Sequence, residues 1–179
     1  MQELCEKQPK GAYGDKPVHF IGRLQTNKVN KVVGHVDLIQ SVDRLELLQC
    51  IENAAARKGL TQKILLEVNI AAEESKAGFS AEEAAALAAR MAAFPHVRLC
   101  GLMAIPPISQ KNGDNLIFFQ KMHTLCVDIS RKKYDNVTMD CLSMGMSDDY
   151  ADAIACGSTM IRVGTAIFGA RHYPDKENK

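Results

Sequence analysis

The most restrictive feature of this chain is a set of short segments that are apolar almost throughout. In residues 64–70, Ile-Leu-Leu-Glu-Val-Asn-Ile, apolar residues do not alternate with polar ones, as they would in a strand with one solvated face. A strand buried on both faces has this pattern, which is typical of parallel sheets covered by helices. The strand candidates, several of them of this kind, are residues 19–24, 36–42, 64–70, 99–105, 140–146 and 160–168.

Helix-like stretches separate these segments. Two of them follow a capping-box pattern, Asp43 with Glu46 and Ser80 with Glu83. A third helix is predicted within residues 116–133, where apolar residues recur at helical spacing. A short fourth helix is predicted over residues 148–156, because Gly157 follows as a natural helix end. Strict alternation of strands and helices predicts a parallel sheet, either doubly wound or closed as a barrel.

Composition excludes several classes of protein. The 179 residues carry 22 Lys and Arg against 21 Asp and Glu, so a net charge of +1 argues against a nucleic-acid-binding face. No apolar run approaches the roughly 18 residues of a membrane span, and the N-terminus lacks the apolar core of a signal peptide. The six cysteines are scattered without CxxC pairs, which favours reduced thiols in a cytoplasmic protein over a zinc site or a disulfide framework.

The predicted strands end in polar or glycine-rich residues, where parallel folds place their sites. Ser147 stands where a strand gives way to a helix, and Gly164-Thr165 closes the next strand. Together they can hold an anion, but Ser147 can equally be a plain N-cap. Asp148 and Asp149 can be metal ligands or partners of the helix dipole, and their first-turn position favours the dipole.

Charged residues in or beside the strands leave further alternatives open. Arg162 lies inside an apolar strand, so it either pairs with a carboxylate such as Glu67 or contacts a ligand at the strand end. His19 is the first residue of the first predicted strand, and it is either a structural residue or a catalytic base. The lysines outside the strands are expected to be solvated or to contact a phosphate or carboxylate; they are Lys28, Lys31 and Lys76.

Several motifs together resemble the YggS/PROSC family, the pyridoxal 5′-phosphate (PLP) homeostasis proteins, which are similar to the N-terminal domain of alanine racemase. The strongest match is Leu-Ser-Met-Gly-Met-Ser-Asp-Asp at 142–149, followed by Gly-Ser-Thr-Met-Ile-Arg-Val-Gly-Thr-Ala-Ile-Phe-Gly-Ala-Arg at 157–171. The other matching segments are residues 19–28, 41–43, 68–78 and 101–106. They span nearly the whole chain.

The resemblance implies a TIM-type (β/α)8 barrel that holds PLP at the carboxyl ends of its strands. It implies that Ser147, Gly164 and Thr165 bind the phosphate, and that Arg162 faces the pyridine nitrogen. An arginine there keeps the nitrogen unprotonated and makes PLP a weaker electron sink, which suits a carrier. The cofactor wall would include Met103 and Ser143, and no metal is implied.

The chain also departs from the family pattern. The family's Ser-Lys-Thr-like strand end, whose lysine forms the Schiff base, is absent, as is a following Phe-Gly-Glu-Asn-Tyr-like motif. We therefore expect a barrel that lacks roughly its first two strands, with residues 1–173 as one partial PLP-binding domain and 174–179 as a charged tail. PLP binding would be non-covalent at best, no catalytic residue is assigned, and open barrel edges favour self-association in a family of monomers.

Three functions follow from these observations. The leading one is PLP binding in vitamin B6 homeostasis, in the cytoplasm, without catalysis, where PLP-dependent apoenzymes are possible clients. The second is a PLP-dependent racemase-type enzyme, for which the sequence offers neither the lysine nor an opposing acid or base. The third is a cofactor-free interaction fragment.

Overall fold

A computed structural model describes residues 6–7, 10–73, 75–108, 111 and 113–169 of the chain. Within these residues, six strands form one sheet in the order of the sequence, and every neighbouring pair is parallel. The strands are β1 (His19–Phe20), β2 (Leu38–Val42), β3 (Gln62–Glu67), β4 (Val97–Met103), β5 (Val137–Met146) and β6 (Met160–Arg162). Parallel strands in sequential order are the arrangement of a β/α-barrel wall, so the predicted parallel sheet is confirmed.

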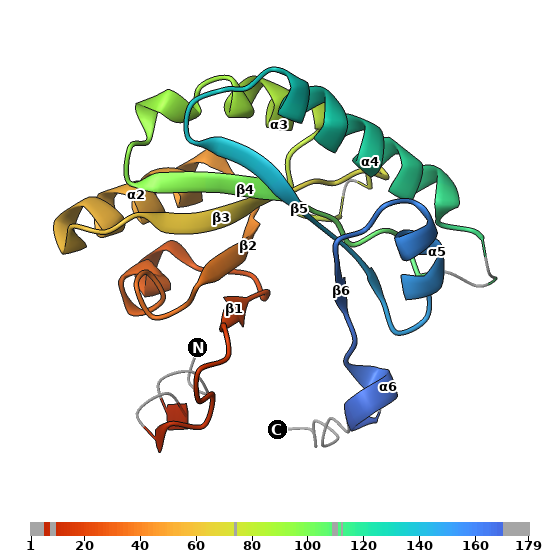
Figure 1. Ribbon diagram of the computed structural model, residues 1–179, viewed down its shortest axis with the longest axis horizontal. Coiled ribbons are helices and arrows are strands. Elements are labelled where there is room, and N and C mark those ends of the chain that lie inside the picture. Colours follow the sequence, from red (N-terminus) through yellow and green to blue (C-terminus); the bar gives the residue numbers. More distant parts are fainter. Residues whose placement is uncertain (1–5, 8–9, 74, 109–110, 112, 170–179) are drawn as a thin grey trace, which may run out of the picture.

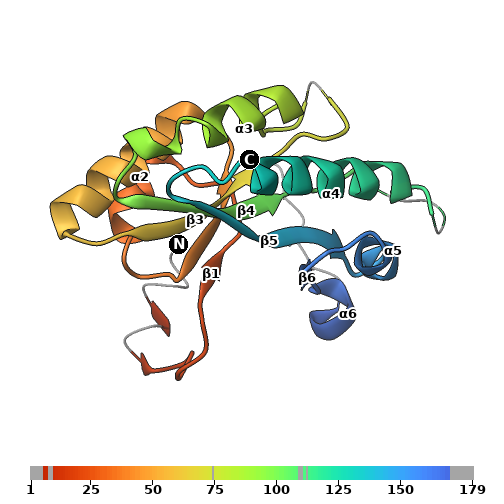
Figure 2. The same cartoon turned by 45° about the horizontal axis from the view of Figure 1, so that its top comes forward.

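Helices connect the strands from β2 onward, and a last short helix follows β6. They are α2 (Leu45–Lys58), α3 (Ala81–Ala88), α4 (Leu116–Arg131), α5 (Tyr150–Ala155) and α6 (Thr165–Phe168), with 3-10 turns η2 (Thr26–Lys31) and η3 (Met91–Ala93). The sheet is bent into an arch, with β1 and β6 at its two ends and α2, α3 and α4 on its convex side (Figures 1 and 2). None of the described helices is both long and apolar enough to cross a membrane.

The main core lies between the convex face and the helices, where the apolar strand patterns predicted it. Alternate residues of the central strands point into it, such as Ile64 and Leu66 of β3 and Leu99 of β4, all with no exposed surface. The concave face carries a smaller apolar cluster around Leu38, Leu65 and Met103. Burial on both faces explains why residues 64–70 do not alternate.

Two of the predicted strands are shorter in the structure than expected. The strand expected over 160–168 ends at Arg162, because the backbone N–H groups of Ile167 and Phe168 bond to the Gly164 carbonyl and form α6 instead. The strand expected over 19–24 is limited to His19–Phe20, since only these residues pair with β2.

The capping-box prediction for the first helix also fails. The helix begins after Arg44, and the buried Asp43 carboxylate accepts a hydrogen bond of 2.5 Å from the Arg44 guanidinium instead of capping the backbone. The box at Ser80 and Glu83 is confirmed, with both reciprocal hydrogen bonds present.

Close approach of two strands requires a glycine at position 101. An added Cβ there would lie 1.7 Å from the Cys141 carbonyl oxygen and 2.6 Å from its carbon. We predict that Gly101→Ala lowers the free energy of unfolding by about 3 kcal/mol or more, because the backbone of β5 has to shift. Gly22→Ala is the matched control, since its Cβ would have no neighbour within 4 Å. Urea unfolding followed by circular dichroism measures both; equal stabilities would contradict the prediction.

Candidate functional site

The six residues that the resemblance assigned to the cofactor lie on neighbouring strands at one edge of the sheet. Met103 ends β4 and pairs with Ser143 of β5, while Met146 of β5 pairs with Arg162 of β6. Ser147 follows β5, and Gly164 and Thr165 follow β6. The structure therefore brings residues from three separate motifs together on β4, β5 and β6 and in the loops that follow them.

Ser147 connects the loops that follow β5 and β6. Its hydroxyl accepts hydrogen bonds from the backbone N–H groups of Gly164, at 3.3 Å, and Ala166, at 3.2 Å. Asp149 is the residue that precedes α5, so the interpretation of Ser147 as a plain N-cap of that helix is wrong. The hydroxyl and the backbone donors at the start of α6 thus form one polar cluster of the kind that binds oxyanions.

Arg162 is half-buried, and its guanidinium is held by two uncharged groups. One terminal nitrogen donates to the Ser143 hydroxyl at 2.6 Å and the other to the Ala104 carbonyl at 2.9 Å. Burial lowers the pKa of Arg162, and the charge of Glu67 opposes that shift. Of the two alternatives considered for Arg162, the one with Glu67 is seen only as a through-space effect on the pKa, because the guanidinium donates to Ser143 and Ala104 instead. The contact with a ligand at the strand end stays a prediction.

Glu67 is the titratable carboxyl group of this edge. It ends β3, and burial together with the charge of Asp43 raises its pKa to about 7, although Arg162 lowers it. The side chain lines a cavity of about 180 Å³ with Asn69, Lys76 and Ile105. A carboxyl group whose pKa is raised by burial in a pocket is typical of functional sites.

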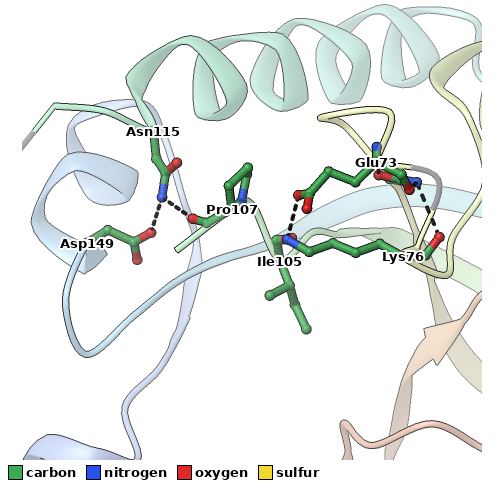
Figure 3. A network of polar contacts seen from close by, with 7 residues as sticks. Glu73, Lys76, Ile105, Pro107, Asn115 and Asp149 are labelled. Atoms are coloured by element: carbon green, nitrogen blue, oxygen red, sulfur yellow. Dashed lines mark hydrogen bonds and ion pairs between the residues drawn. The ribbon is translucent and has the colours of Figure 1, made fainter. Parts of the chain in front are cut away.

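The loops around the site are tied to one another by polar side chains (Figure 3). Asn115 donates to the Pro107 carbonyl at 3.0 Å and to the Asp149 carboxylate at 2.8 Å. Asp149 also accepts from the backbone N–H of Met146, so this carboxylate holds the loop after β5. Lys76 lies 2.6 Å from the carboxylate of Glu73 and donates to the Ile105 carbonyl at 3.5 Å. Of the alternatives for Lys76, the contact with a carboxylate is the one observed.

Sequence reasoning missed Gln40, which is 1% exposed and lies on the concave face of β2. It accepts a hydrogen bond of 2.7 Å from Ser143 and donates to Nδ1 of His19, 3.1 Å away. A polar residue inside an apolar strand was the available signal. His19 is accordingly a hydrogen-bonded residue of the concave face, as the structural interpretation of it predicted.

The polar ends of parallel strands in a bent, helix-covered sheet define a protein of the β/α-barrel class. Residues 1–172 match the family described as "Alanine racemase, N-terminal domain". The chain is 42% identical over 161 residues to the pyridoxal phosphate homeostasis protein of Haemophilus influenzae. The aligned residues cover 90% of this chain and 68% of that protein. It is 40% identical over 173 residues to the Aquifex aeolicus protein of the same name, covering 97% and 75%. The chain therefore belongs to the family of pyridoxal phosphate homeostasis proteins.

Solved structures support the same assignment. The structure of PipY from Synechococcus elongatus PCC7942 with PLP bound has a TM-score of 0.82 at 31% identity, covering 94% of this chain and 78% of PipY. An alanine racemase from Clostridium difficile 630 shares the fold, with a TM-score of 0.68 at 16% identity over 98% of this chain and 44% of that protein. The predicted family and the alanine racemase type of fold are both confirmed.

The titration of Glu67 makes stability depend on pH. Because its pKa is higher in the folded protein than the ordinary 4.5, folding favours the protonated form, and that contribution is lost as pH rises from about 4.5 through about 7. We predict that Glu67→Gln stabilises the protein relative to the wild type at pH 8 but not at pH 5. After allowance for solvent screening, the gain is about 1–2 kcal/mol.

Urea unfolding of both proteins at the two pH values measures this difference. Glu46→Gln, which removes an exposed carboxylate, is the control and should leave the wild-type pH dependence in place. A stability difference between Glu67→Gln and the wild type that is the same at pH 5 and pH 8 would contradict the prediction.

Proposed function

We propose that this chain binds PLP at the carboxyl ends of β4, β5 and β6 and serves vitamin B6 homeostasis in the cytoplasm, without catalysis of its own. The observation that carries the proposal is the cluster in which the Ser147 hydroxyl accepts from the backbone N–H groups that begin α6, near the half-buried Arg162. A phosphate group fits the first part, and an aromatic ring nitrogen fits a guanidinium with free donors. PLP carries both groups, and PipY binds it.

Each residue has a role in this proposal. Ser147, Gly164 and Thr165 bind the phosphate, and Arg162 donates to the pyridine nitrogen, which stays unprotonated beside a permanent cation. Met103 and Ser143 form the wall beneath the ring, where both are fully buried. When bound, PLP supplies the aldehyde and electron-withdrawing ring that its client enzymes use.

The proposal extends to the rest of the chain. Residues 1–173 would form one ligand-binding domain, with its six strands equivalent to the last six of an eight-stranded barrel; the tail at 174–179 lies outside the described residues. Supporting this, β1 and β6 each have a single neighbour in the described sheet, and Phe168 of α6 is 85% exposed. Self-association through these edges and transfer of PLP to apoenzymes belong to the same proposal. The five described cysteines are free, in keeping with a reducing compartment.

Removing the Ser147 hydroxyl should weaken binding of the phosphate in particular. We predict that Ser147→Ala lowers the affinity for PLP about 10-fold, the equivalent of ~1.4 kcal/mol for one lost bond to a charged group. The affinity for pyridoxal, which lacks the phosphate, should change less than about 2-fold. Equilibrium dialysis with each ligand measures this.

Ser130→Ala, the same change on the exposed face of α4, is the matched control. Equal losses of PLP and pyridoxal affinity in Ser147→Ala would place the phosphate elsewhere. Absence of PLP binding by the wild type would refute the proposed function and favour a cofactor-free role.

The proposed binding is non-covalent, because no lysine lies inside a described strand of this edge and the Lys76 amine is engaged by Glu73. We predict that borohydride treatment of the protein with PLP leaves its mass unchanged, and that added PLP supports no racemisation of alanine. Intact mass spectrometry and a chiral amino-acid assay test both. A stoichiometric adduct lost in Lys76→Arg or Lys28→Arg would contradict the first expectation, and measurable racemisation would favour the enzyme alternative.

A further inference from the structure

A row of polar side chains crosses the concave face from one edge strand to the other. His19 of β1, Gln40 of β2, Ser143 of β5 and Arg162 of β6 are joined by three consecutive hydrogen bonds of 3.1, 2.7 and 2.6 Å. In the sheet, β3 and β4 separate β2 from β5, so the Gln40–Ser143 bond spans the inside of the arch (Figure 1). Ser143 is fully buried and Gln40 nearly so, which makes an unpaired polar group on either of them costly.

The neighbours of Gln40 determine the direction of each bond. Its amide nitrogen lies 3.1 Å from the Met160 sulfur, which can only accept, and it also donates to Nδ1 of His19. The amide oxygen therefore faces Ser143 and accepts the hydroxyl proton. His19 must present an unprotonated Nδ1, and burial lowers its pKa in the same sense.

This order has a consequence for Arg162. A serine hydroxyl has one proton, and since that proton goes to Gln40, the oxygen lone pairs of Ser143 are directed to the guanidinium. Because the Ala104 carbonyl is the second acceptor, both terminal nitrogens of the guanidinium are hydrogen-bonded and its plane is fixed. Without Gln40, the buried hydroxyl proton loses its acceptor, and the hydroxyl can rotate away from the guanidinium toward another one.

We propose that Gln40, anchored by His19, is a positioning residue for Arg162: it holds the Ser143 hydroxyl as an acceptor and so orients the guanidinium toward the ring nitrogen of the bound pyridine. This inference rests on the proposed function. Gln40 acts through Ser143, and its side chain bonds to His19, Met160 and Ser143, none of which is assigned to the phosphate. Its loss should therefore affect ring recognition and leave phosphate recognition intact.

The test uses pyridoxine 5′-phosphate, which has the ring and phosphate but no aldehyde, and inorganic phosphate. In Gln40→Leu we expect an affinity for pyridoxine phosphate about 10-fold lower, the loss of one oriented charge-assisted bond, and an affinity for phosphate changed less than about 2-fold. The ultraviolet spectrum of the bound ligand should shift from the unprotonated toward the protonated ring. His19→Phe should give the same changes to a smaller extent, because Met160 still accepts from Gln40.

Leu38→Val is the matched control, because Leu38 lies two residues before Gln40 on the same face of β2 and makes apolar contacts. It should lower stability without moving the spectrum. Gln40→Leu with the affinities and spectrum of this control would overturn the inference, as would equal losses for pyridoxine phosphate and inorganic phosphate. Wild-type protein that binds neither PLP nor pyridoxine phosphate would instead refute the proposed function.

A second measurement needs no ligand. In the unliganded protein, NMR exchange of the Arg162 side-chain N–H protons with water reports how firmly the guanidinium is held. We expect exchange at least about 10-fold faster in Gln40→Leu than in the wild type and in Leu38→Val. Unchanged exchange in Gln40→Leu would overturn the positioning role whatever the binding experiment shows.

Discussion

The organisation of the concave face depends on the partial burial of one permanent positive charge. A guanidinium that is partly withdrawn from water needs hydrogen-bond acceptors, and Arg162 has them in the Ser143 hydroxyl and the Ala104 carbonyl. Because these acceptors are neutral, the hydrogen bonds satisfy the guanidinium without cancelling its charge. Nearby, burial and the charge of Asp43 raise the pKa of Glu67 to about 7.

The two faces of the sheet serve different purposes. The convex face is a conventional apolar core under α2, α3 and α4, and it makes the strands a rigid platform. On the concave face, apolar residues such as Leu65 and Met103 alternate with a polar row that runs from His19 to Arg162. Rigid strands are needed for that row, because hydrogen bonds between β2 and β5 require fixed distances across the arch.

Much of this arrangement could be predicted from residues close together in sequence. The apolar run at 64–70 indicated a strand buried on both faces, and Ser80 with Glu83 marked a helix start that the structure confirms. Asp43 with Glu46 carried the same local signal, yet Asp43 instead bonds the guanidinium of Arg44. The pattern failed there because a cation that the pattern ignores competes with the helix backbone for the carboxylate.

The sequence by itself determined the order of strands and helices, the family, and the residue types available at the strand ends, since each depends on local pattern or on similarity along the chain. Tertiary structure alone decided the contacts that neither local pattern nor family resemblance indicated. Gln40 and Ser143, which are 103 positions apart, form such a contact. The physical reason is that bending a parallel sheet brings side chains of non-neighbouring strands together, and no periodicity along the chain encodes that curvature.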